Sequence, residues 1–236
     1  MTTAMVIGAN GGIGAALVAA CADDARYSRV IAAARRPPDA LPSGVEYLPI
    51  DIADPGSIEA AAARIEGPLA RVIVATGMLH DDTGGPERSL RDLDADRLAH
   101  LFAINTIGPA LALRHFAPLL AKDAPSAIAC ISARVGSVSD NRLGGWYGYR
   151  ASKAALNQIV RTAAIELARS RPQATCVALH PGTVDTGLSK PFQRGVPAEK
   201  LFTPAYSAGR LLTVLDGLTP AQSGRIFAWD GAEIAP

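Results

Sequence analysis

Aromatic residues are scarce in this chain, and neither sign of charge is in excess. Phe, Trp and Tyr together make up 5% of the 236 residues, and the formal net charge is only +1. A near-neutral chain lacks the basic surface that nucleic acids and anionic membranes bind, so we expect no such partner. No apolar run approaches the roughly 20 residues that span a bilayer. The sequence therefore predicts a soluble, cytoplasmic protein.

The three cysteines, Cys21, Cys130 and Cys176, lie far apart among apolar neighbours. Their number is odd, and no two of them have the spacing of a metal-binding or redox pair. We therefore expect reduced core thiols and no metal site. The segment from Met1 to Ile7 enters an apolar run without the basic stretch and cleavage site of a secretory signal, which also favours the cytoplasm.

Short apolar runs alternate with segments of helical periodicity along the whole chain. The expected strands are Ala4–Ile7, Arg29–Ala34, Val45–Asp51, Arg71–Met78, Ala127–Ser132, Thr175–His180 and Arg225–Trp229. The expected helices are Ala15–Ala22, Pro55–Ile65, Asp94–Ile107, Pro109–Leu120, Tyr149–Arg169 and Pro204–Leu215. This alternation, without a linker or repeat, predicts one α/β domain over residues 1–236 with a doubly wound parallel β-sheet.

A glycine-rich turn joins the first expected strand to the first expected helix. It contains Gly8, Asn10, Gly11, Gly12, Ile13 and Gly14. Glycines allow a tight turn and let backbone N–H groups approach a pyrophosphate at the N-terminus of a helix. The context predicts a dinucleotide site, with an ordinary strand-to-helix turn as the alternative.

Two arginines follow the second expected strand, where an enzyme that prefers NAD has an acidic residue for the ribose 2′-hydroxyl. Arg35 or Arg36 would instead bind a 2′-phosphate, which predicts NADP(H) rather than NAD(H). A solvated basic turn is the alternative interpretation.

The ends of the third and fourth strands are also expected beside the cofactor. Asp51 and Ile52 would meet the adenine edge, although Asp51 or Asp54 could also cap the following helix. Ala75, Thr76 and Gly77 are small enough to let a ring pass close to the backbone.

Tyr149 and Lys153 lie one turn apart on the helix expected over Tyr149–Arg169. A lysine ammonium beside a phenol would lower the tyrosine pKa toward the working pH of a general acid–base catalyst. A chance pair on a solvated face is the alternative for these two residues taken alone. Asn105 interrupts the apolar stripe of its helix, so it must bond either to a neighbouring carbonyl or to a water relay.

Together these residues resemble the short-chain dehydrogenase/reductase family over essentially the whole chain. The matching pieces are Gly8-x3-Gly12-x-Gly14, Asp51, Ala75-Thr76-Gly77, Asn105, Tyr149-x3-Lys153 and Pro181-Gly182. Ser132–Ser137 and Trp229-Asp230-Gly231 resemble the branch that contains C-factor-type proteins and sniffer-like carbonyl reductases. The resemblance implies a single-domain Rossmann fold and a homodimer or homotetramer.

The resemblance also implies a role for each matching residue. Tyr149 would exchange a proton with the substrate oxygen, Lys153 would lower its pKa and bind the nicotinamide ribose, and Asn105 would hold a water. The nicotinamide and diphosphate would be lined by Pro181, Gly182, Thr183, Val184 and Thr186.

The serine of the family pattern is displaced in this chain. Counting back from Gly136, the expected position holds Ala133, and Ser132 lies one residue earlier. Within a strand, one residue turns a side chain to the opposite face. We nevertheless expect Ser132 to orient the substrate carbonyl, with Ser137 as the alternative.

These observations predict an NADP(H)-dependent oxidoreductase that transfers hydride between nicotinamide and a carbonyl or alcohol of a small, largely apolar substrate. The alternative is a dinucleotide-binding signalling or sensor protein of the C-factor type with little turnover. The substrate lining is expected from His80, Leu143, Trp146 and the segment from Leu188 to Phe202.

Overall fold

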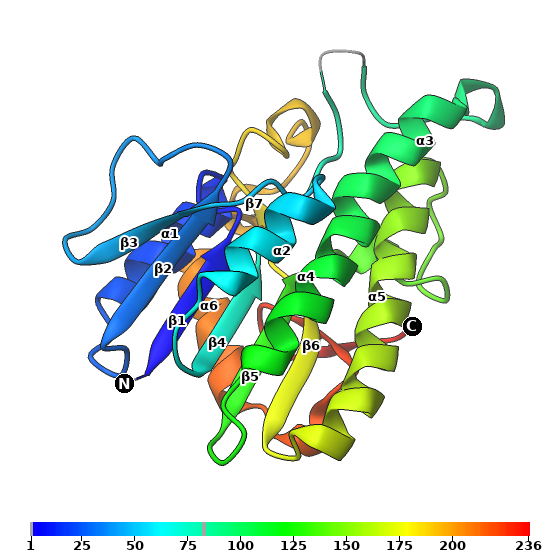
Figure 1. Ribbon diagram of the computed structural model, residues 1–236. Helices are drawn as coiled ribbons and strands as arrows, with labels where there is room; N and C mark the ends of the chain where they lie inside the picture. The colour runs from blue at the N-terminus through cyan, green and yellow to red at the C-terminus, as the bar shows by residue number, and fades with distance from the viewer. Residues whose placement is uncertain (1, 82–83) are drawn as a thin grey trace.

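The computed structural model describes residues 2–81 and 84–236. Within them, eight strands form one sheet in the order β10-β9-β6-β5-β4-β1-β2-β3 (Figure 1). Only β10 runs antiparallel to its neighbour. The strands are β1 (Thr3–Ile7), β2 (Arg29–Ala34), β3 (Val45–Pro49), β4 (Leu69–Val74), β5 (Ser126–Ile131), β6 (Ala174–His180), β9 (Ile226–Ala228) and β10 (Glu233–Ile234). The predicted doubly wound parallel sheet is confirmed.

The strand order reverses between β1 and β4, and there the sheet forms its crevice. Ile7 of β1 pairs with Ala33 of β2 on one side and with Val74 of β4 on the other, so the three strands end level. The loops that follow these ends carry the glycine turn, the two arginines and the Ala75–Gly77 segment. Sheet register therefore brings the predicted cofactor residues to one edge.

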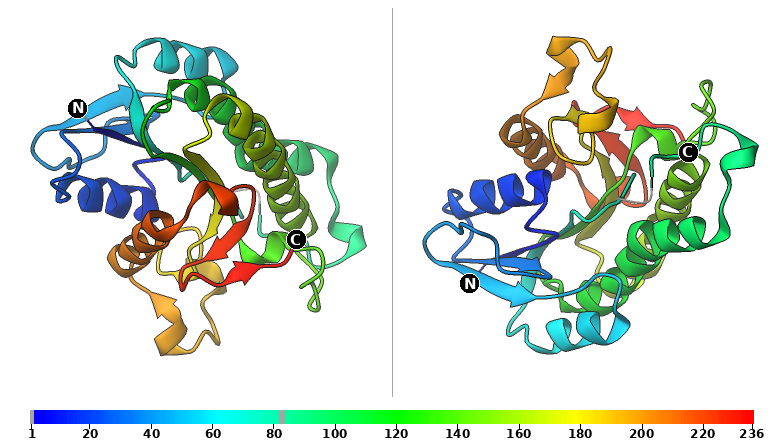
Figure 2. Two further views of the ribbon diagram at one scale, coloured as in Figure 1. Left: turned by 90° about the horizontal axis from the view of Figure 1, so that it is seen from below. Right: turned by 90° about the horizontal axis from the view of Figure 1, so that it is seen from above.

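Helices cover both faces of the sheet (Figure 2). α1 (Gly12–Ala22) and α6 (Pro204–Gly217) pack on one face, and α2 (Pro55–Ala63), α4 (Gly108–Phe116) and α5 (Tyr147–Ser170) pack on the other. Successive strand residues alternate between the two core clusters, because their side chains point to opposite faces. No helix in the described part of the chain is long and apolar enough to cross a membrane.

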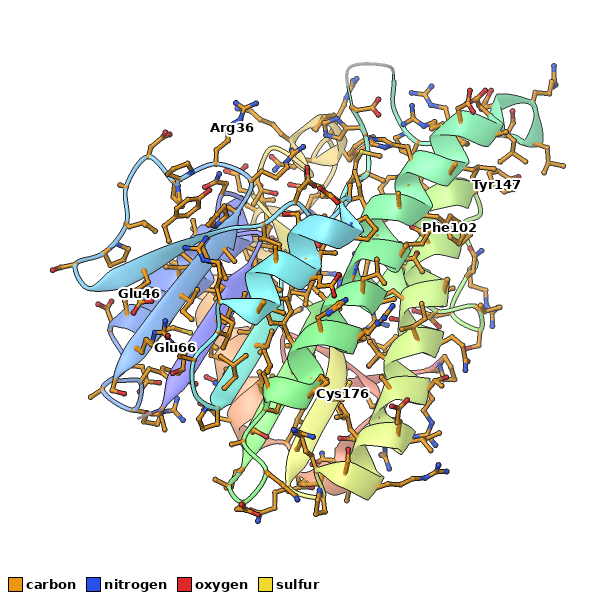
Figure 3. The ribbon with its side chains drawn as sticks, in the orientation of Figure 1. Arg36, Glu46, Glu66, Phe102, Tyr147 and Cys176 are labelled. Atoms are coloured by element: carbon orange, nitrogen blue, oxygen red, sulfur yellow. The ribbon has the colours of Figure 1, made fainter. Side chains whose placement is uncertain are left out.

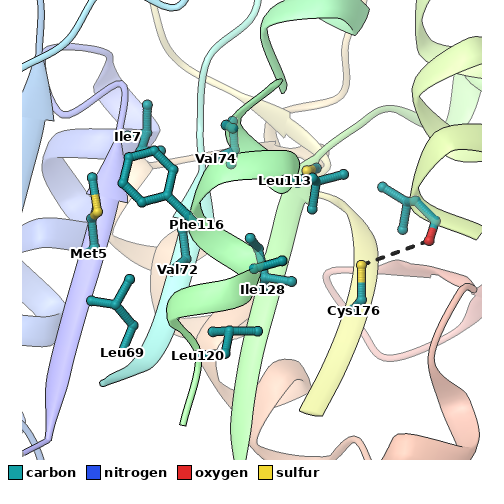
Figure 4. Packing of buried hydrophobic residues seen from close by; sticks show 14 of the residues in the cluster. Met5, Ile7, Leu69, Val72, Val74, Leu113, Phe116, Leu120, Ile128 and Cys176 are labelled. Atoms are coloured by element: carbon teal, nitrogen blue, oxygen red, sulfur yellow. Dashed lines mark hydrogen bonds between the residues drawn. The ribbon is translucent and has the colours of Figure 1, made fainter. Parts of the chain in front are cut away.

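The core on the α4 side is tightly packed around Phe116, which is fully buried (Figure 4). Cys176 lies in the same cluster, with its Sγ 3.8 Å from the Val160 carbonyl oxygen. All three cysteines are buried and unpaired, as predicted. Burial raises the pKa of Cys21 to about 11 and that of Cys130 to about 12, so these thiols stay protonated.

The predicted helix over Asp94–Ile107 is not regular. α3 (Ala95–Phe102) is followed by one π turn, Ala103–Ile107, which leads directly into α4. The turn is held where Gly108 lies against the Ile52 backbone, since a Cβ on Gly108 would meet the Ile52 carbonyl oxygen at 2.3 Å. A local insertion of this kind leaves no mark in the hydrophobic period, so the sequence did not predict it.

Other differences concern element ends and short pairs. α5 begins at Tyr147 rather than Tyr149, and β3 ends at Pro49 rather than Asp51. The small parallel pair β7 (Thr183–Val184) and β8 (Leu201–Phe202), together with β10, was not predicted. Two-residue strands are too short to show an alternating pattern.

Candidate active site

Two adjoining hollows lie at the carboxyl edge of the sheet. The larger, of about 640 Å³, extends from the glycine turn to α5 and the segment after β6, and the smaller, of about 540 Å³, extends toward β2 and β3. They share the lining residues Asn10, Gly11, Ala75, Thr76 and Gly77. An extended ligand can therefore occupy both at once.

Most of the predicted site residues line these hollows. The larger contains Gly12, Ile13, Ser132, Tyr149, Lys153, Pro181, Gly182, Thr183, Val184 and Thr186 besides the shared residues. The smaller adds Gly8, Arg35, Arg36, Asp51 and Ile52. Gly14 and Asn105 lie behind the lining, and each supports it through contacts described below.

Backbone approach requires glycine at two points of the predicted turn. Gly8 has φ +93°, and a Cβ on Gly14 would lie 2.1 Å from the Gly8 carbonyl oxygen. Gly11 precedes α1, and among the described residues no side chain caps this helix and no acid occupies its first turn. The N-terminal N–H groups and the dipole of α1 therefore favour an anion at the hollow.

The two arginines both line the smaller hollow and both are exposed. Arg36 projects from the loop after β2 (Figure 3), and its carbonyl oxygen accepts a 2.8 Å hydrogen bond from Asn10 Nδ2. This bond ties the arginine loop to the glycine turn.

Asp51 lines the same hollow, and its carboxylate accepts the Ala53 N–H at 2.9 Å. Asp54, rather than Asp51, caps α2.

Tyr149 and Lys153 are both buried, 8% and 2% exposed. Lys153 Nζ donates to the Ile131 carbonyl oxygen at 2.9 Å and lies 5.9 Å from the centroid of the Tyr149 ring. The predicted lowering of the tyrosine pKa is wrong for the protein alone: burial raises the pKa of Tyr149 to about 12. Burial also lowers the pKa of Lys153 to about 8, because desolvation disfavours both charged forms.

Asn105 is fully buried in the π turn and bridges two segments. Its Oδ1 accepts the Met78 N–H and its Nδ2 donates to the Met78 carbonyl oxygen, both at 2.8 Å. Nδ2 also donates to Ser152 Oγ at 3.1 Å. The structural bridge predicted for Asn105 is therefore present, and it fixes the loop after β4 against α5.

Ser132 lines the larger hollow, as predicted, and is 2% exposed. Its Oγ lies 2.7 Å from Asn157 Oδ1 of α5, whereas Asn157 Nδ2 is buried without a partner among the described residues. If the amide is turned over, Nδ2 donates to Ser132 Oγ and frees the hydroxyl proton for the hollow. Ser137 is outside the lining, and its Oγ points to the Pro236 carbonyl oxygen.

Sequence reasoning missed His180, the last residue of β6. It lines the larger hollow, and its Nδ1 is buried without a partner in the described structure. Burial and the nearby Arg134 charge lower the pKa of His180 to about 4, so the ring is neutral at physiological pH. Its position directly before Pro181-Gly182, which were expected beside the nicotinamide, could have identified His180 as a site residue from the sequence.

The expected substrate lining is partly correct. Trp146, Leu188 and Phe192 line the larger hollow, and Leu79 joins them. Leu143 is 91% exposed and does not, because the loop turns it to solvent. His80 is outside the lining as well; its Nε2 lies 3.1 Å from the Gly187 carbonyl oxygen.

Two bacterial proteins with assigned names are similar in sequence. A 1-hydroxy-2-glutathionyl-2-methyl-3-butene dehydrogenase from Rhodococcus sp. is 35% identical over 98% of each chain. C-signal from Myxococcus xanthus is 39% identical over 62% of this chain and 82% of its own. The predicted likeness to C-factor-type proteins is thereby confirmed.

A solved structure with the same architecture is the NADPH-bound carbonyl reductase from chicken fatty liver. It superposes with a TM-score of 0.85 at 27% identity, covering 99% of this chain and 98% of that one. The family model described as short chain dehydrogenase matches residues 2–196. With the fold, the paired hollows and the buried Tyr149 and Lys153, these matches show that the chain belongs to the short-chain dehydrogenase family of oxidoreductases.

Proposed function

We propose that the protein is an NADP(H)-dependent oxidoreductase that reduces a carbonyl, or oxidises the corresponding alcohol, of a small and largely apolar molecule. The observation that carries this proposal is the placement of Tyr149 and Lys153, both buried, in the wall of a hollow that continues to Arg35 and Arg36. The carbonyl reductase similar in structure is bound to NADPH, which agrees with the arginine-based prediction.

The residues present fit a dinucleotide phosphate. The uncapped N-terminus of α1 would receive the pyrophosphate, and Arg35 or Arg36 would pair with the 2′-phosphate. Gly77 leaves open the space beside Lys153, since a Cβ there would lie 3.5 Å from Nζ. When bound, the nicotinamide supplies or accepts the hydride.

Tyr149 would donate the proton that the substrate oxygen requires when the carbonyl is reduced. Its raised pKa keeps the phenol protonated at neutral pH, which is the form needed for donation. Lys153 is mainly charged at pH 7, because its pKa of about 8 lies above that pH. Its ammonium would stabilise the phenolate left after the transfer, and Ser132 would donate a hydrogen bond to the substrate oxygen.

The lining beyond Tyr149 favours an apolar substrate. Leu79, Val135, Trp146, Phe192 and Val196 supply most of this wall. Apolar and aromatic side chains with a few convergent polar groups are the usual composition of such pockets. A cytoplasmic location and a homodimer or homotetramer complete the proposal.

The test is a fluorescence titration with NADPH and with NADH on the wild type and on Tyr149→Phe, followed by turnover on a panel of aldehydes and ketones. We expect tighter binding of NADPH in both proteins and a loss of kcat of about 10²- to 10⁴-fold in the variant. Glu59→Gln, on the exposed face of α2, is the control.

Three results would contradict parts of the proposal. Equal or tighter binding of NADH would reject the role of Arg35 and Arg36. Unchanged kcat in Tyr149→Phe would reject the phenol as proton donor. NADPH binding without turnover of any carbonyl would favour the signalling or sensor alternative.

A further inference from the structure

Trp146 separates the larger hollow from a third cavity. This third cavity, of about 700 Å³, is lined by the segment from Gly84 to Arg88 and by Asp92, Asp94 and Arg97. Trp146 and Phe192 line both spaces. Their ring centroids are 5.2 Å apart, at an interplanar angle of 62°. The two rings therefore form a wall between the proposed substrate site and a cavity of similar size, and we call them the aromatic wall.

The backbone of Trp146 is in an unfavourable conformation. Its φ of 54° and ψ of 43° are left-handed, and it is the only non-glycine residue with positive φ in the described part of the chain. Gly144 and Gly145 precede it with similar φ values of 65° and 64°. A bulky side chain in this region is an outlier that persists only where the surroundings hold it.

Glu87 stabilises this conformation of Trp146 through two hydrogen bonds. Its carbonyl oxygen accepts the Trp146 N–H at 2.6 Å, and its carboxylate Oε2 accepts the Gly148 N–H at 3.1 Å. The side chain is only 1% exposed. α5 has no capping side chain of its own at Trp146, so the carboxylate of this distant residue satisfies an N-terminal N–H and complements the helix dipole.

The bonds from Glu87 also help to position the proposed catalytic Tyr149. Trp146 lies 6.3 Å from Tyr149 between ring centroids, and Tyr149 follows Gly148 directly. A residue that fixes Gly148 therefore also fixes the start of the turn that carries the phenol. Glu87 Oε1 makes no hydrogen bond to the described residues and lies 3.9 Å from Arg97 Nε, so charge balance as well as the bond to Gly148 keeps it in place.

We propose that the aromatic wall limits the size of the substrate, and that Glu87 is the positioning residue that holds Trp146 in the wall. The inference rests on the proposed carbonyl reductase function. Removing the indole would join the substrate hollow to the third cavity and admit a carbonyl compound with a bulky apolar extension. Removing the Glu87 carboxylate would release the Gly148 N–H and leave only the backbone bond from the Trp146 N–H to the Glu87 carbonyl oxygen, so Trp146 would be held less firmly and the effect would be smaller but in the same direction.

The test compares benzaldehyde with biphenyl-4-carbaldehyde as substrates of wild type, Trp146→Ala, Glu87→Ala and Glu87→Gln. We expect the ratio of kcat/KM for the bulky over the small aldehyde to rise at least tenfold in Trp146→Ala and several-fold in Glu87→Ala. Glu87→Gln can still accept the Gly148 N–H, so it should return most of the way to the wild-type ratio. Glu59→Gln is the matched control for loss of a carboxylate.

A second measurement reports on the wall without turnover. In a Trp229→Phe background Trp146 is the only tryptophan, and acrylamide quenching of its emission should increase in Glu87→Ala but not in Glu59→Gln. Unchanged quenching in folded Glu87→Ala would overturn the positioning role. Turnover by the wild type with an unchanged ratio in Trp146→Ala would overturn the size limit. Absence of wild-type turnover on both aldehydes and the wider panel would reject the proposed function and the size limit with it, while quenching would still decide the role of Glu87.

Discussion

The two halves of the site are built in different ways. The half around the glycine turn consists mainly of backbone: glycines, the free N-terminus of α1 and small residues at strand ends. The half around Tyr149 consists of side chains whose burial or backbone conformation costs free energy. Examples are Lys153, which is 2% exposed, and Trp146, which has a positive φ. The buried His180 Nδ1 and Asn157 Nδ2, both without a partner in the described residues, belong to this second half.

The difference teaches where the fold gives up stability for chemistry. Desolvated charges, backbone strain and unsatisfied polar atoms each cost free energy, and such costs are usual where a site must react rather than only bind. The glycine half gains binding from groups that any helix N-terminus exposes. We therefore expect substitutions in the first half to damage binding and stability together, and substitutions in the second half to separate stability from activity.

The largest effect is expected from Gly14→Ala in the glycine half. Its Cβ would lie 2.1 Å from a backbone oxygen, so the turn must move. We expect the Kd for NADPH to rise at least 100-fold and the free energy of unfolding to fall by an amount on the order of 2 kcal/mol. Isothermal titration and thermal unfolding would measure both. Gly209→Ala in α6 is the control, because open space surrounds its Cβ position. An unaltered Kd in Gly14→Ala would break the comparison.

Lys153→Met should show the opposite sign for stability. The lysine pKa falls from its usual 10.5 to about 8 on folding, so the unfolded chain binds more protons between these two values and wild-type stability rises with pH across that window. Below pH 8 the penalty is fully present. At pH 7 we expect the variant to be more stable by about 2 kcal/mol, after allowing for the lost bond to Ile131, and to be inactive.

Denaturant unfolding at pH 7 and pH 10 measures this difference. The advantage of Lys153→Met should shrink toward pH 10, where the folded wild type has already released the proton. Above pH 10 the raised pKa of Tyr149 acts in the other direction, because the folded state then keeps a proton that the unfolded chain loses. A wild type that is more stable than the variant at pH 7 would contradict the assignment of cost to this half.

Arg35→Ala and Arg36→Ala sharpen the comparison within the glycine half. Both side chains are exposed, so we expect no change in melting temperature. The residue that pairs with the 2′-phosphate should weaken NADPH binding by 10- to 100-fold and leave NADH binding unchanged. Parallel titrations with both nucleotides would identify which arginine it is. Equal losses for NADPH and NADH would mean that the arginines do not read the 2′-phosphate.

The smallest effect is expected from Ser132→Ala. Its hydroxyl is shared with Asn157, so removal should lower kcat/KM for a carbonyl substrate by about tenfold without changing the NADPH Kd. Ser137→Ala is the matched control, because Ser137 lies outside the hollow. Steady-state kinetics on the two variants would test this, and a larger loss in Ser137→Ala would reverse the assignment.

The predictability of the site follows the same division. The position of the glycine turn and the arginines at the carboxyl edge of the sheet could be predicted, because each is local in sequence and follows a strand of regular pattern. Glu87 and Asn157 were not found, since their partners lie 61 and 25 residues away. Such pairs depend on how α5 lies against the sheet and against the loop before α3, and no spacing in the sequence encodes that.

The fold was predicted closely for the same reason. Strands of five to seven residues were predicted with ends within a few residues, because all of them except the edge strand β3 are largely buried, and a buried parallel strand is a nearly continuous apolar run. The strands that were not predicted, β7, β8 and β10, have only two residues each, and their pairing depends on tertiary contacts. Leu143 was misplaced because hydrophobicity alone does not say which way a loop side chain turns.

Because of the π turn at Ala103–Ile107, the number of residues in this helical stretch decides which way the side chains beyond it face. Each residue added to or removed from a helix rotates everything beyond it by about 100°. The turn's wider winding brings Asn105 to Met78 while Phe116, further along, still faces the core. Losing one residue there would satisfy one of these two alignments and break the other. Substitutions on the outer face of this stretch should therefore be tolerated, whereas a change in its length should not.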